Sequence, residues 1–155
     1  MTLPHLTENN WNTLGGRPIL NIQQRIQRRL EEDRYTFHVG TDSKSYKDYT
    51  VVTTTICFRE NGSGALVAYQ RNKVDNFTNI AERLIHETLV SIEAALMVQD
   101  ITGTPPTVHS DINTKESALS NRSMSVIMGM VNGMGFPVKV KPDAWAADIA
   151  DMFTR

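Results

Sequence analysis

Apolar residues recur at two different spacings in the first half of the chain. From Leu20 to Glu32 they return about every four positions while arginines occupy the other side, which predicts an amphipathic helix. Three runs rich in β-branched residues follow, joined by short polar turns, and this pattern is typical of an antiparallel meander. The three predicted strands cover Tyr35–Thr41, Thr50–Phe58 and Ala65–Asn72.

The second half of the chain alternates between helical and strand patterns. A long helical repeat runs from about 76 to 99, a short strand covers 107–112, and a second helical repeat covers 117–133. Another short strand is expected over 137–141, after which Pro142 opens a last helix. Because helices connect the later strands, we expect those strands to pair in parallel.

Together these elements predict an α/β fold with a five-stranded mixed sheet, in which three strands are antiparallel and two are parallel, and with flanking helices. Residues 1–18 are polar and rich in turn-forming residues, so they are expected to form an N-terminal arm. Residues 19–155 then make up a single domain, and a chain of 155 residues is long enough to bury a core of its own.

Charge, cysteine content and hydropathy narrow the function classes. The 16 basic and 17 acidic residues give a net charge of −1, so no bulk basic excess attracts nucleic acid. A metal-loaded acidic site would nevertheless bring its own positive charge. Cys57 is the only cysteine and cannot form an internal disulfide, which favours a reducing compartment. No apolar run approaches the ~20 residues of a membrane span, so we expect a cytoplasmic protein.

Two aspartates stand where predicted strands end. Asp42 follows the first strand and Asp111 ends the fourth, each beside apolar or β-branched neighbours. Aspartate is unfavourable in strands, so each residue either begins a turn or serves a ligand. If the first and fourth strands are parallel neighbours, the two carboxylates approach each other.

Acidic residues on two predicted helices add candidates. Glu87 and Glu93 lie at opposite borders of the apolar side of the long helix, so the helical wheel does not choose between them, and either could face solvent. Asp143 falls in the first turn of the last helix, where it would also complement the helix dipole. Asp148 and Asp151 lie further along that helix, and its rise places Asp151 ~12 Å from Asp143, too far for both to bind one metal easily.

The carboxylates are more informative together than singly. Several carboxylates without compensating bases repel one another, so they require cations, and hard oxygen ligands select Mg²⁺ or Mn²⁺. Two such ions ~3.5–4 Å apart activate a water and stabilise the leaving oxygen of a phosphodiester. The sequence therefore predicts a two-metal hydrolytic site, with catalytic and metal-binding roles for Asp42, Glu87, Asp111 and Asp143.

Four segments carry a family resemblance. They are His38–Ser43, Val108–Ile112, Gly129–Phe136 and Lys139–Ala147, and the most specific part is the run Lys-Pro-Asp-Ala-Trp-Ala-Ala. These segments resemble the YkuK-like family of small bacterial and phage proteins within the ribonuclease H-like superfamily. The resemblance implies a ribonuclease H-like fold and metal-dependent nuclease activity.

The matching motifs imply that Asp42, Asp111 and Asp143 correspond to the acidic site of that family. Glu87 is carried over on weaker grounds, because the helix between the motifs varies and Glu93 remains a rival. Either Asp148 or Asp151 is the alternative to Asp143.

Polar residues near the two strand ends are candidates for substrate binding. Lys44 follows Asp42, and Lys115, Asn121 and Arg122 follow Asp111. Such residue types contact nucleic-acid backbones, although ordinary surface residues have the same composition.

The preferred function is hydrolysis of RNA, an RNA–DNA hybrid or structured DNA. The alternative is a noncatalytic nucleic-acid-binding or assembly module with the same fold. The clustered aspartates favour the enzyme, because a binding module gains little from negative charge beside phosphate.

Overall fold

The computed structural model describes residues 6–7, 9–112 and 118–155, and for 118–124 it describes the backbone alone. The described chain forms one sheet with the strand order β2-β1-β5-β4-β3-β6-β7. The strands are β1 (Trp11–Thr13), β2 (Pro18–Ile19), β3 (Tyr35–Ser45), β4 (Thr50–Glu60), β5 (Gly64–Val74), β6 (Thr107–His109) and β7 (Val138–Lys139). The helices are α1 (Ile22–Glu31), α2 (Ile80–Thr102), α3 (Ala118–Gly133) and α4 (Trp145–Asp151).

The mixed sheet is confirmed, but its predicted size is wrong. Strands β3, β4 and β5 form the antiparallel meander. Strand β6 pairs in parallel with β3, and β7 pairs in parallel with β6. The sheet has seven strands instead of five because β1 and β2 extend it beyond β5. These two strands come from the stretch predicted as a polar arm, and Trp11 within it is only 1% exposed. Strands of two or three residues are too short to show an alternating pattern.

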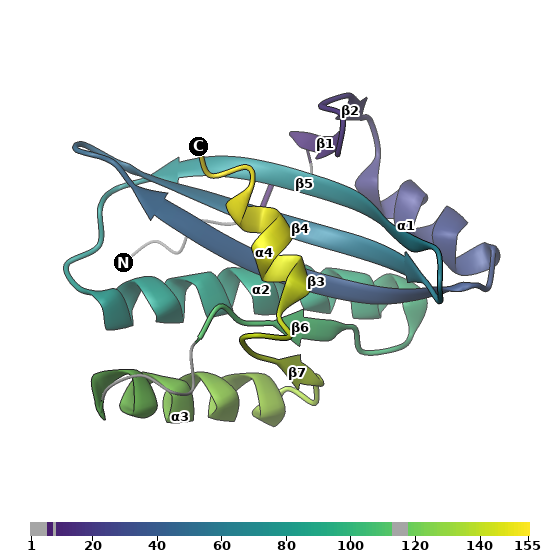
Figure 1. Cartoon of the computed structure of the whole chain (residues 1–155). Helices are drawn as coiled ribbons and strands as arrows, with labels where there is room; N and C mark the ends of the chain where they lie inside the picture. Colours follow the sequence, from purple (N-terminus) through teal and green to yellow (C-terminus); the bar gives the residue numbers. More distant parts are fainter. Residues whose placement is uncertain (1–5, 8, 113–117) are drawn as a thin grey trace.

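Each face of the sheet has its own apolar core. Helices α1, α2 and α3 cover one face, and the short helix α4 crosses the other (Figure 1). Alternate residues of a strand point to opposite faces, so Ile56 joins the larger core while Cys57 meets Ala146 of α4 in the smaller one. Cys57 is therefore a buried, free cysteine.

Helix α4 lies unusually close to β3. A Cβ atom added at Gly40 would stand 2.6 Å from the carbonyl carbon of Ala146 and 2.6 Å from the amide nitrogen of Ala147. No side chain fits between the two backbones at this point, so glycine is required there. The Oγ1 of Thr55 lies 3.2 Å from the carbonyl oxygen of Gly40 and 3.0 Å from that of Ala146. Its single hydroxyl hydrogen is shared by these two acceptors and so joins the two elements.

Several element boundaries differ from those predicted. Strand β3 continues to Ser45, so Asp42 lies inside the strand and pairs with Thr53 of β4. Helix α2 begins after its N-cap Asn79. Helix α4 begins at Trp145, three residues later than Pro142 suggests. Among the described residues, no helix combines the length and the apolar character needed to cross a membrane.

Candidate carboxylate site

The central carboxylates of the site come from β3 and from the segment just after its parallel neighbour β6. The β3–β6 register pairs Val39 with Val108 and Gly40 with His109. Continuing this register for two residues places Asp111 opposite Asp42. The structure therefore brings together the two aspartates that the sequence placed on adjacent parallel strands.

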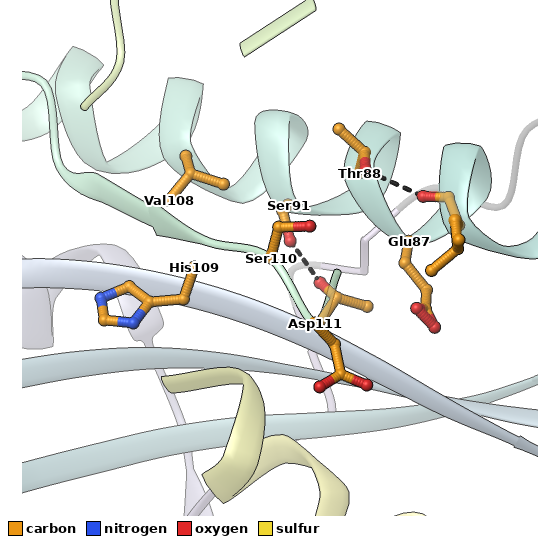
Figure 2. A pocket seen from close by; sticks show the side chains of 9 residues that line it. Glu87, Thr88, Ser91, Val108, His109, Ser110 and Asp111 are labelled. Atoms are coloured by element: carbon orange, nitrogen blue, oxygen red, sulfur yellow. Dashed lines mark hydrogen bonds between the residues drawn. The ribbon is translucent and has the colours of Figure 1, made fainter. Parts of the chain in front are cut away.

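Glu87 of α2 reaches the same region. Its side chain is 5% exposed, its Oε1 accepts a hydrogen bond from Ser43 Oγ at 2.9 Å, and Arg83 Nε lies 3.9 Å away. Figure 2 shows the Glu87 carboxylate extending from α2 into the hollow that Asp111 also lines. Glu93 instead accepts a hydrogen bond from the amide of Leu6 at 3.2 Å. Of the two rival glutamates, the structure brings Glu87 to the aspartates.

The carboxylates approach the end of the sheet from both faces. Asp42 shares the face of Gly40, which α4 covers, whereas Thr41 and Ser43 point toward α2. Ser43 thus meets Glu87 on one face while Asp42 lies on the other. The site encloses the ends of β3 and β6, with α2 on one side and α4 on the other.

Asp143, the fourth predicted ligand, does not line the hollow that Glu87 and Asp111 share. It precedes α4 and lines a different hollow together with Arg59 and Trp145. The alternatives left open in the sequence lie nearer: Asp151 forms a side-chain hydrogen bond with Asp42, and Asp148 is close enough to Asp111 for their charges to interact. The physical reason is that α4 starts later than predicted and projects its last turn toward Asp42.

Burial and mutual repulsion dominate the electrostatics. Burial raises the pKa of Asp42, and the Glu87 carboxylate, the Asp151 hydrogen bond and Asp111 raise it further. Burial likewise raises the pKa of Glu87 to about 8, although Arg83 opposes the shift. The site therefore contains more acidic groups than its basic neighbours can neutralise.

Lys141 is a second basic residue in contact with the cluster, besides Arg83, and the sequence-based prediction missed it. Its Nζ lies 3.1 Å from Asp111 Oδ1, and this hydrogen bond raises the pKa of the lysine. The position follows from the parallel pairing, because the amide of Lys141 donates to the carbonyl of Ile112 directly after Asp111. The available sequence signal was that Lys141 ends the short strand predicted over 137–141, which is expected to run parallel to the strand that ends at Asp111.

The predicted substrate-binding residues can be placed only in part. Lys44 is exposed near the end of β3, with its Nζ 5.5 Å from the centroid of the Tyr46 ring. Lys115 lies outside the described residues. Asn121 and Arg122 belong to α3, but the description there stops at the backbone.

The donor set has the chemistry of a site for a hard divalent cation. Asp42, Glu87 and Asp111 offer oxygen ligands, which Mg²⁺ and Mn²⁺ prefer, and their burial makes a compensating cation favourable. As they stand, no three histidine, cysteine or carboxylate side chains in the described part of the chain are close enough to hold a metal ion. Binding an ion would therefore require the carboxylates of Asp42, Glu87 and Asp111 to move closer together.

Comparison with known proteins identifies the family of this chain. The family model for ribonuclease H-like proteins matches residues 19–155. The chain belongs to the ribonuclease H-like family. It is also 29% identical over 156 residues to the uncharacterized protein YkuK of Bacillus subtilis (strain 168), a match that covers 87% of this chain and 90% of the relative. The resemblance drawn from the four sequence segments is thereby confirmed.

Proposed function

We propose that this chain hydrolyses phosphodiester bonds of nucleic acid with the help of divalent cations. The observation that supports it is the meeting of Asp42, Glu87 and Asp111 from three separate segments in a ribonuclease H-like chain. Membership of this family favours a role with nucleic acid. The substrates proposed are RNA, an RNA–DNA hybrid or structured DNA.

The proposed ligands are Asp42, Glu87 and Asp111, with Asp151 in place of Asp143. Two ions, Mg²⁺ or Mn²⁺, bound to such a carboxylate set lower the pKa of a water and stabilise the leaving oxygen of the phosphodiester. Asp151 is chosen because its carboxyl already hydrogen-bonds to Asp42.

The neighbouring residues orient the carboxylates. Ser43 donates to Glu87 Oε1 and fixes one oxygen, which leaves the other oxygen for a ligand. Lys141 holds Asp111 through one ammonium hydrogen, and its side chain is 45% exposed, so it can also contact a phosphate oxygen. The lysine thus lies where it can position both a carboxylate and the strand to be cut.

A cleavage panel tests the proposal. Labelled single-stranded RNA, an RNA–DNA hybrid and a branched DNA are each incubated with Mn²⁺, Mg²⁺ or EDTA. We expect cleavage of at least one substrate with metal and none in EDTA. Asp42→Asn should lose this activity, while Glu93→Gln, a matched change on the same helix as Glu87, should keep it.

The same panel separates the enzyme from a noncatalytic binding module. Retarded migration of a substrate without cleavage under any metal condition would refute hydrolysis and favour the module. Cleavage that survives Asp42→Asn and Asp111→Asn would show that the activity does not depend on the carboxylate cluster.

A further inference from the structure

A second hollow lies at the other end of α4. It has a volume of about 530 Å³ and is lined by Arg59, Val138, Lys139, Pro142, Asp143 and Trp145. This volume is within the range of sites that hold small organic ligands. None of these residues belongs to the carboxylate cluster, so the function proposed above leaves the hollow without an assigned role.

The wall of the hollow combines positive charge with an aromatic ring. The guanidinium carbon of Arg59 lies 5.5 Å from the centroid of the Trp145 ring, and Lys139 follows on β7. Asp143 contributes a carboxylate, so the two basic residues leave a net charge of +1. A flat ring beside two basic groups is suited to a ligand that has both an aromatic surface and a negative charge.

The Trp145 ring is packed against two histidines that are themselves hydrogen-bonded. The Trp145 ring packs on His38 and His109, with centroid distances of 4.6 and 4.7 Å. The amide of Ala146 donates to His109 Nδ1 at 3.2 Å, and the two histidines share a 3.0 Å hydrogen bond. His38 Nε2 in turn lies 2.8 Å from Thr36 Oγ1. A ligand therefore meets a preformed surface.

The hollow and Asp42 lie on the same face of β3. His38, which supports Trp145, and Asp42 point to the same face of the strand, and four residues of strand separate them by ~13 Å. Helix α4 runs between them, with Trp145 at its start and Asp151 at its end. Since a duplex strand advances ~3.4 Å per nucleotide, this separation corresponds to about four nucleotides.

We infer that the hollow binds one nucleotide of the nucleic-acid strand, with its phosphate at Arg59 and Lys139 and its base against Trp145. The inference rests on the proposed function, because it treats the hollow as a subsite a few nucleotides from the bond to be cut. Backbone contacts of this kind fix the position of a strand without reading its sequence. The subsite would therefore set where along the strand cleavage occurs.

Tryptophan fluorescence provides a readout that does not depend on cleavage. The chain has two tryptophans, and Trp11 is 1% exposed with its Nε1 bonded to the carbonyl of Thr7, so Trp145 is the one that lines the hollow. A six-nucleotide single-stranded RNA is titrated in EDTA at several salt concentrations. We expect a saturable change in emission that Trp145→Phe abolishes and Asp42→Asn retains.

Charge variants test the phosphate contact. Arg59→Gln and Lys139→Gln should each weaken binding about tenfold or more and lower the slope of log K against log salt by about one. Arg17→Gln makes the same charge change at the opposite side of the sheet, on the turn between β1 and β2, and should stay within twofold. Asp143→Asn should tighten binding, since it removes a negative charge from the wall, and a merely structural role for Asp143 would not.

The outcomes for the subsite and for the nuclease are distinguishable. If the wild type cleaves nothing but binds the RNA through Arg59 and Lys139, hydrolysis fails and the subsite stands. If cleavage is found while Arg59→Gln and Lys139→Gln bind and cleave as the wild type does, the subsite is wrong. Absence of any Trp145-dependent signal also overturns it. Melting curves of each variant show whether it is still folded. If Arg59→Gln does not fold, Arg59→Lys keeps the positive charge and should bind the RNA nearly as well as the wild type.

Discussion

Replacing Glu87 by glutamine should make the metal-free protein more stable. Burial raises the pKa of Glu87 to about 8, so at neutral pH the folded chain keeps a proton that the unfolded chain releases. The contribution of Glu87 to the free energy of unfolding is fully present below its ordinary pKa of 4.5 and is lost as the pH rises toward 8. At pH 7 the cost is at most about 3 kcal/mol, from ~1.4 kcal/mol for each pH unit.

Glutamine has nearly the same shape and is neutral, and its oxygen can still accept from Ser43 Oγ. In EDTA at pH 7 we therefore expect Glu87→Gln to unfold up to about 6–12 °C above the wild type, and to match it near pH 4. With Mn²⁺ at 100 times its dissociation constant the wild type should gain ~2.7 kcal/mol and the variant much less. Differential scanning fluorimetry across pH and Mn²⁺ concentration measures both effects.

Glu93→Gln is the control, because it makes the same substitution on the same helix but away from the cluster. It should respond to Mn²⁺ as the wild type does. A Glu87→Gln protein that melts below the wild type in EDTA at pH 7 would refute the electrostatic reasoning. An unchanged response to Mn²⁺ would remove Glu87 from the ligand set.

Three further outcomes are expected. Asp151→Asn should lose Mn²⁺-dependent cleavage and the Mn²⁺-induced rise in melting temperature, whereas Asp143→Asn keeps both; the reverse result would restore Asp143 to the site. Gly40→Ala should lower the free energy of unfolding by about 1–3 kcal/mol in urea titrations, because its Cβ would overlap the backbone of α4, and unchanged stability would contradict the close contact. Burial lowers the pKa of His38 to about 4, so the free energy of unfolding should fall as the pH drops from about 6.5 toward 4. The same pH titration of His38→Gln should show a smaller fall, and an unchanged fall would assign the effect to another group.

The sequence predicted those parts of the fold that depend on local patterns. The β-branched runs mark β3, β4 and β5 because a meander needs only neighbouring strands and short turns. The end of β3 was missed because Ser43, Lys44 and Ser45 resemble a turn, and only their pairing with β4 makes them a strand. Strands β1 and β2 were missed for the same reason, since their partners are distant in sequence or too short to show a pattern.

The candidate site was likewise predictable only where it depends on local patterns and strand order. Asp42 and Asp111 could be placed together because parallel strands bring their carboxyl ends to one edge. The start of α4 was predicted too early because Pro142 is a reasonable first helical residue, yet the helix starts at Trp145. The contact between Asp151 and Asp42 depends on how α4 crosses the sheet, and no local pattern contains that crossing direction.

The absence of a side chain at Gly40 affects how the protein can tolerate mutation. Elsewhere in a core, substitutions shift packed elements because side chains act as spacers of variable size. Between β3 and α4 the spacer is missing, so main-chain atoms set the separation. Apolar residues around α4 can then change over evolution with little effect on the distance between Asp42 and Asp151, as long as position 40 stays glycine. The glycine at position 40 thus keeps the distance between Asp42 and Asp151 nearly constant while neighbouring residues are substituted.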